Sequence, residues 1–263
     1  MFLKVLKYDL KWVFSLINIF YILALVFAVL SRITLYIEDS FVFMIINKIL
    51  SATSISMIVS AFINVLTRSW VRFKKNMYAD ESYLSHTLPV SKNILYYSKT
   101  LTSVIAIFVT FIILIICILL CYFSENFIEG LKLIINSSAQ SLDVTTGSFV
   151  FYLLLIIILE FIYILFSGYT GMIIGHRFNQ NKTGMSVLFG FAIYMACQTV
   201  MVIVMFLAGL LFSKELLELF TSTNPQIDAV KTIFVLGNML YLTFDIAIFF
   251  VGKQQLSKGV NVD

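Results

Sequence analysis

The stretch LTSVIAIFVTFIILIICILLCYF, residues 101–123, is apolar along almost its whole length and contains no charged residue. A helix of about 20 apolar residues, rising 1.5 Å per residue, crosses the roughly 30 Å hydrocarbon core of a bilayer. The whole chain agrees with this stretch, since 60% of its 263 residues are hydrophobic and 12% are charged. Soluble domains carry about 25% charged residues. The sequence therefore predicts a membrane protein.

Five other stretches have the same character, so we expect an all-α membrane protein with six transmembrane helices in a single transmembrane domain, residues 1–263. The expected spans cover residues 16–36, 42–66, 101–123, 149–175, 184–212 and 231–251. The second span carries Asn47 and Lys48 in its first third. Either that span begins later, or Lys48 reaches out to the lipid headgroups.

The cations of the chain gather on one side of these spans. Both termini, the segment 67–100 and the turn 176–183 contain most of the lysines and arginines, whereas the other connections mix cations with acids. By the positive-inside rule, both termini face the cytoplasm. The first residues, MFLKVLKYDLKWVF, are amphipathic, with Lys4, Lys7 and Lys11 on one face. They favour a helix lying at the membrane surface, or else the plain beginning of the first span.

The longest polar interval, TRSWVRFKKNMYADESYLSHTLPVSKNILYYSKT, spans residues 67–100 and has two parts. A basic, aromatic-rich continuation of the second span comes first and suits an anionic leaflet. Pro89 then interrupts the helix, so a short helix from Asp80 to Thr87 should end there, and Ser91 can cap the next one. We expect a short helix outside the membrane that can pass a push from a soluble partner to both long helices.

These residues resemble a known family. Glu81, the run Thr87-Leu88-Pro89-Val90-Ser91 and the Leu-x-x-Ser-Lys pattern of residues 95–99 are similar to the cytoplasmic loop of bacterial ABC-2 type transporter permeases. The resemblance implies a multi-pass protein of the bacterial cell membrane. It also implies an N-terminal elbow helix and a coupling helix that docks on a separate ATP-hydrolysing subunit. The alternative is a loop that simply joins two helices.

Carried over to this chain, the family pattern places its functional residues in two segments. The elbow helix would run through Trp12 and include Lys4, Lys7 and Lys11, and the coupling helix would lie within residues 80–91. The residues expected to contact the ATPase are Asp80, Glu81, Tyr83, Leu84, His86, Leu88 and Pro89. The implied partners are two ATP-binding subunits, a second permease that is identical or related, and the lipid bilayer.

The chain contains no sequence pattern typical of an enzyme. NKTG at residues 181–184 lacks the glycine-rich cradle of a phosphate loop, so we expect ATP and Mg²⁺ to be bound by the partner and no cofactor here. His86 and His176 stand alone, which argues against a metal site. The basic interval flanks membrane helices and does not predict nucleic-acid binding.

Two acids lie inside expected spans, Glu160 in the fourth and Asp245 in the sixth. Intramembrane acids face protein or water rather than lipid. They belong either to a transport path, where they would meet a cationic substrate, or to a helix interface. In an interface they would be protonated or hydrogen-bonded to Tyr163, Asn238 or Tyr241.

Small residues predict where two spans touch. Ser167, Gly171 and Gly175 recur every four residues in the fourth span, and Gly190 lies in the fifth. An apolar face within residues 125–135 predicts an additional helix at the membrane surface.

The expected function is a permease subunit that exports an amphipathic or hydrophobic substrate, such as an antimicrobial peptide or a drug. The small number of intramembrane charges favours such a cargo over an ion. Two alternatives stay open: an ion-coupled secondary carrier, and a membrane scaffold or sensor that does not transport.

Overall fold

The computed structural model describes residues 1–37, 41–79, 81–87, 90–142, 144–212 and 227–258, and all regular elements in these ranges are α-helices. The elements are α1 (Phe2–Leu35), α2 (Phe41–Met77), α3 (Ser82–Thr87), α4 (Lys92–Tyr122), α5 (Glu125–Ser141), α6 (Thr146–Gly175), α7 (Lys182–Phe212) and α9 (Ile227–Ser257). Six of them are long and apolar enough to cross a membrane, which confirms the expected multi-pass helical class.

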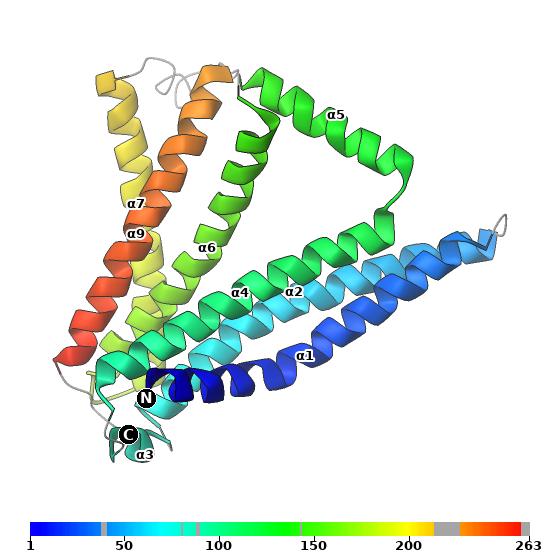
Figure 1. Ribbon diagram of the computed structural model, residues 1–263. Coiled ribbons are helices and arrows are strands. Elements are labelled where there is room, and N and C mark those ends of the chain that lie inside the picture. Colours follow the sequence, from blue (N-terminus) through cyan, green and yellow to red (C-terminus); the bar gives the residue numbers. More distant parts are fainter. Residues whose placement is uncertain (38–40, 80, 88–89, 143, 213–226, 259–263) are drawn as a thin grey trace. The chain divides into compact units, whose positions relative to one another are not determined.

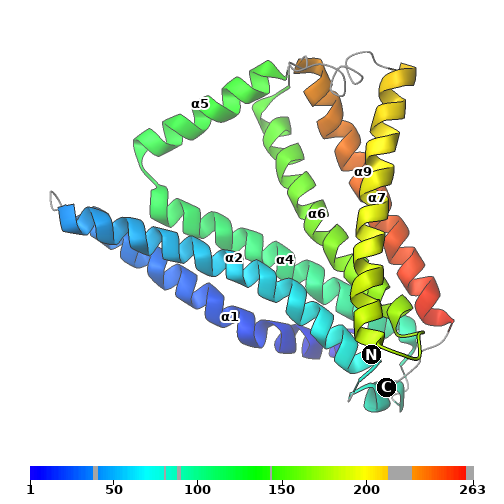
Figure 2. The same ribbon diagram turned by 180° about the vertical axis from the view of Figure 1, so that it is seen from behind.

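The chain forms two compact units, Met1–Ile128 and Glu129–Asp263, called here the N-terminal and C-terminal units. In the N-terminal unit the long helices α1, α2 and α4 lie side by side, and the short α3 lies at one end of them (Figures 1 and 2). The buried residues of α1 recur every three or four positions, which is the spacing of one helical face. They are Asp9, Val13, Ile17, Tyr21, Ala24, Ala28 and Ser31.

Hydrogen bonds between small polar side chains join these helices. The hydroxyls of Tyr21 and Thr110 lie 2.6 Å apart and link α1 to α4. Ser54 donates to the Ala24 carbonyl at 2.8 Å and links α2 to α1. Asn47 donates to the Ser31 hydroxyl at 3.0 Å. Such bonds hold helices together where lipid supplies no hydrophobic drive for association.

In the C-terminal unit, α6 packs against both α7 and α9. A Cβ atom on Gly171 would collide with the backbone of Gly190, and one on Gly175 would collide with the backbone of Ser186. The two glycines thus let α6 and α7 approach each other closely. The prediction made from the four-residue spacing of small residues is confirmed.

The helix boundaries match some expectations and change others. The second span continues as one helix to Met77, and Ser91 caps α4, with its hydroxyl accepting from the Ile94 amide at 3.4 Å. At the N-terminus, by contrast, residues 2–35 form one uninterrupted helix, so no break separates an elbow from the first span. The stretch contains no proline or glycine that would end a helix.

Other expected features are partly visible. The helix predicted after the third span is present as α5. A short helix precedes Pro89 as expected, and it begins at Ser82. Asp80, Leu88 and Pro89 lie outside the described residues, as does the side chain of His86.

Candidate functional site

The N-terminal unit contains a buried group of charged and polar side chains from three long helices and the turn before α3. We call it the Asp9 cluster, and its members are Asp9 of α1, Arg72 and Asn76 of α2, Glu81 of the turn, and Ser98 and Lys99 of α4. Asp9 and Lys99 are 2% and 3% exposed. Charged side chains buried this deeply destabilise the folded protein unless partners of opposite charge or hydrogen-bond partners surround them.

Asp9 is the centre of the cluster because its carboxylate accepts from three side chains. Lys99 Nζ lies 3.1 Å from Oδ1 and Arg72 Nε lies 3.0 Å from the same oxygen. Ser98 Oγ donates to Oδ2 at 2.9 Å. One acid on α1 therefore holds both α2 and α4, over sequence separations of 63 and 90 residues.

The cluster continues from Asp9 to the short helix. Arg72 uses a second nitrogen, Nη1, to bind Glu81 Oε2 at 2.8 Å. Asn76 donates to the same Glu81 oxygen and accepts from Lys99 Nζ. Two acids and two cations thus alternate in one connected network, which keeps its net charge balanced. Its last member, Glu81, directly precedes α3.

A second arginine of α2 strengthens the contact with α1. The Arg68 guanidinium lies over the Trp12 ring, 4.2 Å from its centroid, and donates to the Trp12 carbonyl at 2.8 Å. Arg72 also lies 5.3 Å from the Trp12 ring centroid. Trp12, the last residue of the expected elbow, thus takes part in a cation–π contact between α1 and α2.

One side of helix α3 is buried against the protein, and the other side is exposed. Ser82, its first residue, is 1% exposed, whereas Tyr83 and Leu84 are 79% and 69% exposed. Glu81 holds the preceding turn through its side chain, and its backbone amide donates to the Lys75 carbonyl at 3.2 Å. The element is therefore a short helix with two exposed large side chains, attached through a carboxylate to a buried network.

The predicted coupling residues that the structure describes lie in two different surroundings. Tyr83 and Leu84 are exposed, as a contact surface requires. Glu81 is turned toward Arg72 and Asn76 within the chain. The expected elbow cations Lys4, Lys7 and Lys11 are all exposed and lie outside the cluster.

Asp9 and Asn76 were not among the residues singled out from the sequence, whereas Ser98 and Lys99 end the Leu-x-x-Ser-Lys pattern of residues 95–99. For Asp9 a signal exists, because it is the one acid in residues 1–37 and stands in an otherwise basic amphipathic segment. Asn76 carries no comparable signal. Its hydrogen bonds go to Glu81 and to Lys99 of another helix, and no local pattern reveals them.

The two intramembrane acids lie together in a second group within the C-terminal unit. We call it the carboxyl cluster, and its members are Glu160 of α6, Tyr194 and Gln198 of α7, and Tyr241 and Asp245 of α9. Tyr194 donates to Glu160 Oε1 at 3.0 Å, and Gln198 donates to the Tyr241 hydroxyl at 3.2 Å. Asp245 makes none of the hydrogen bonds expected for it with Tyr163, Asn238 or Tyr241.

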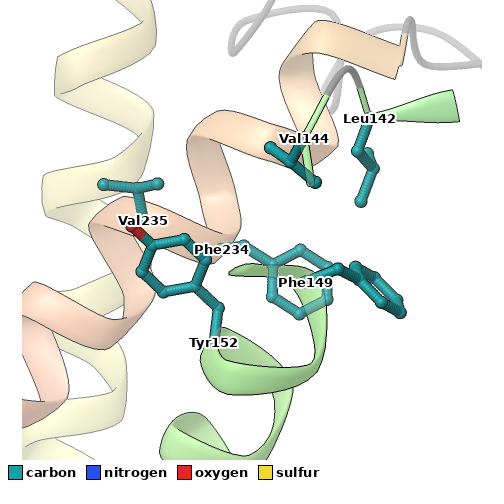
Figure 3. A pocket seen from close by; sticks show the side chains of 6 residues that line it. All are labelled: Leu142, Val144, Phe149, Tyr152, Phe234 and Val235. Carbon is teal, nitrogen blue, oxygen red and sulfur yellow. The ribbon is translucent and has the colours of Figure 1, made fainter. Parts of the chain in front are cut away.

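A small hollow lies at the ends of α6 and α9 where these helices begin, but its lining offers little chemistry. Leucine, valine and phenylalanine side chains surround it, with the Tyr152 ring at one side (Figure 3). The lining residues are Leu142, Val144, Phe149, Tyr152, Phe234 and Val235. Within the described part of the chain, no group of three or more His, Cys, Asp or Glu side chains could hold a metal ion.

No family model, curated protein or solved structure matches the chain.

Proposed function

We propose that the chain is the transmembrane permease subunit of an ABC-2 type transporter, driven by a separate ATPase that docks on α3. The observation that carries this proposal is the attachment of α3. Its two large exposed side chains, Tyr83 and Leu84, offer a contact surface, and Glu81 joins that surface to Arg72 and Asn76. A force applied to α3 would reach α2 through Glu81, then α1 and α4 through the Asp9 cluster.

The motion expected from this arrangement is that of a rigid body. Salt bridges and side-chain packing fix α1, α2 and α4 to one another, so the three helices would tilt together when α3 moves. Two ATPase subunits and a second permease would complete the transporter. An amphipathic or hydrophobic cargo, exported toward the outside, fits the low number of charges in the spans.

Arginine substitutions on α3 test the docking surface. Tyr83→Arg and Leu84→Arg should weaken co-purification of the ATPase about tenfold or more, because losing an interface anchor costs about 2 kcal/mol or more and about 1.4 kcal/mol is tenfold. Both side chains are exposed, so the permease should still insert and fold. Pull-down from native membranes followed by mass spectrometry measures the partner, which should contain a phosphate loop.

Tyr8→Arg is the matched control, since Tyr8 is an exposed tyrosine of the same unit, 67% exposed and placed on α1. It should leave the ATPase bound. Normal co-purification and normal transport in both α3 variants would refute the coupling assignment.

An ion-coupled carrier is the second candidate, favoured by the two acids of the carboxyl cluster. For such a carrier, transport in vesicles would follow an ion gradient and would not respond to ATP. For an ABC-2 type transporter, transport in vesicles would require ATP and would not follow an ion gradient.

A further inference from the structure

The carboxyl cluster contains three carboxylate oxygens that are buried without a hydrogen-bond donor. They are Glu160 Oε2 and both Oδ1 and Oδ2 of Asp245. Asp245 is 4% exposed, so its carboxyl group is enclosed by protein. Among the described residues, no Lys, Arg or His side chain forms an ion pair with either acid. The Asp9 cluster, in contrast, pairs each of its acids with a cation.

The groups that face the two carboxyls are neutral when protonated. Tyr163 on α6 contacts the ring of Tyr194 on α7 at 5.1 Å between centroids and the ring of Tyr241 on α9 at 5.8 Å. Cys197 of α7 interacts with Tyr163. Tyr194 donates to Glu160, and Gln198 of α7 donates to the Tyr241 hydroxyl of α9. None of them carries a positive charge.

The two acids lie on facing sides of α6 and α9. Tyr163, three residues after Glu160 on α6, contacts the ring of Tyr241, which lies one turn before Asp245 on α9, so an ionised Glu160 acts on Asp245. If both were ionised, two negative charges would repel each other, and no cation among the described residues forms an ion pair that offsets them. A bound proton removes one of these charges and supplies the donor that the open oxygens lack. It also needs no cavity.

We propose that Glu160 and Asp245 together form a proton-binding site in the C-terminal unit. Asp245, which is buried and without a partner, holds the proton, and Glu160, which is half-buried and hydrogen-bonded to Tyr194, connects the pair with the surroundings. The site does not depend on the proposed ATPase, because it follows from these helices alone. It holds for either candidate function.

Infrared spectroscopy of the full-length protein in lipid nanodiscs tests the proposal. A protonated carboxylic acid has a C=O stretching band separate from the carboxylate bands, and the band shifts when D₂O replaces H₂O. We expect such a band at neutral pH, its shift in D₂O, and its loss in alkaline buffer. Asp245→Asn should abolish it. Glu160→Gln should shift the pH at which the Asp245 band is lost, because the two groups interact.

Three results would overturn the proposal. The first is a spectrum in which both variants match the wild-type protein at every pH. The second is a band that neither exchanges in D₂O nor responds to pH, which would indicate a sealed structural acid. The third is a band that appears in choline buffer and vanishes when Na⁺ or K⁺ is added, because the occupant would then be an alkali cation.

A chemical measurement keeps the test independent of how the variants fold. Dicyclohexylcarbodiimide is an apolar reagent that reacts with protonated carboxyls. In the unmodified wild-type protein it should label Asp245 or Glu160, with less labelling as pH rises, and peptide mass spectrometry locates the adduct. Absence of adduct at both residues, with labelling of other acids, would contradict the proposal.

Discussion

At the scale of single residues, Asp9 shows how one carboxylate organises a membrane protein. It is 2% exposed and is held by Arg72, Ser98 and Lys99. Buried ion pairs give little net stability compared with apolar packing, yet breaking one is costly, because an uncompensated charge stays behind. We therefore expect Asp9 to act mainly by specifying which faces of α2 and α4 meet α1.

We expect Asp9→Ala to destabilise the protein by about 3–5 kcal/mol, since Lys99 would remain buried without its counter-charge. Lys99→Met should cost less, because Asp9 keeps Arg72 and Ser98. The double variant should lose less than the sum of the two single losses. Thermal unfolding in detergent, followed by size-exclusion chromatography, measures all three proteins.

The exposed Lys11→Ala on the same helix is the control, and its effect should stay within about 0.5 kcal/mol. Strictly additive losses for Asp9 and Lys99 would show that the two side chains do not act as a pair.

At the scale of elements, the existence and extent of the long helices could be predicted from the sequence, because hydropathy and length report directly on a membrane span. The Ser91 cap could also be predicted, since capping is local. The continuity of α1 matches one of the two alternatives that the sequence left open. The amphipathic pattern of its first residues fits both a surface helix and a helix packed against neighbours, and in the structure Asp9 and Val13 are buried.

The partners of the intramembrane acids could not be predicted for a related reason. The position of Glu160 within a span indicates that it needs a hydrogen-bond partner. Its donor, Tyr194, comes from another helix and lies 34 residues away in the sequence. The register between α6 and α7 depends on Gly171 and Gly175 packing against Ser186 and Gly190. Spacing identifies a face for packing and leaves the matching face on the neighbour undetermined.

Two glycines at one contact give a matched pair of substitutions. Gly171→Ala should destabilise the C-terminal unit by about 1–3 kcal/mol, because its Cβ would collide with backbone atoms of Gly190. Backbone atoms cannot move aside by changing rotamer as a side chain could. Gly190→Ala should be neutral or stabilise by up to about 1 kcal/mol. There the new Cβ would lie 3.5 Å from the Ser167 carbonyl oxygen, an ordinary contact, and alanine favours the helix.

Melting temperatures of the two variants in the same detergent measure this difference. Equal melting temperatures would mean that α6 and α7 are not in close contact at Gly171.

At the scale of the whole molecule, the distribution of cations predicts an orientation that labelling can check. Residues 67–100 and both termini should face the cytoplasm, and α5 should lie on the outer side, because positively charged connections stay inside. Tyr83 of α3 and Lys132 of α5 are both exposed, so a cysteine at either position should react readily.

The native Cys117, Cys121 and Cys197 are first replaced by alanine. In intact cells a membrane-impermeant maleimide should label Lys132→Cys strongly, and Tyr83→Cys should react only after permeabilisation. The permeabilised sample is the control for reactivity of each thiol. Labelling of Tyr83→Cys in intact cells would place α3 outside, where no cytoplasmic ATPase can bind it. That result would refute both the predicted orientation and the ABC-2 proposal.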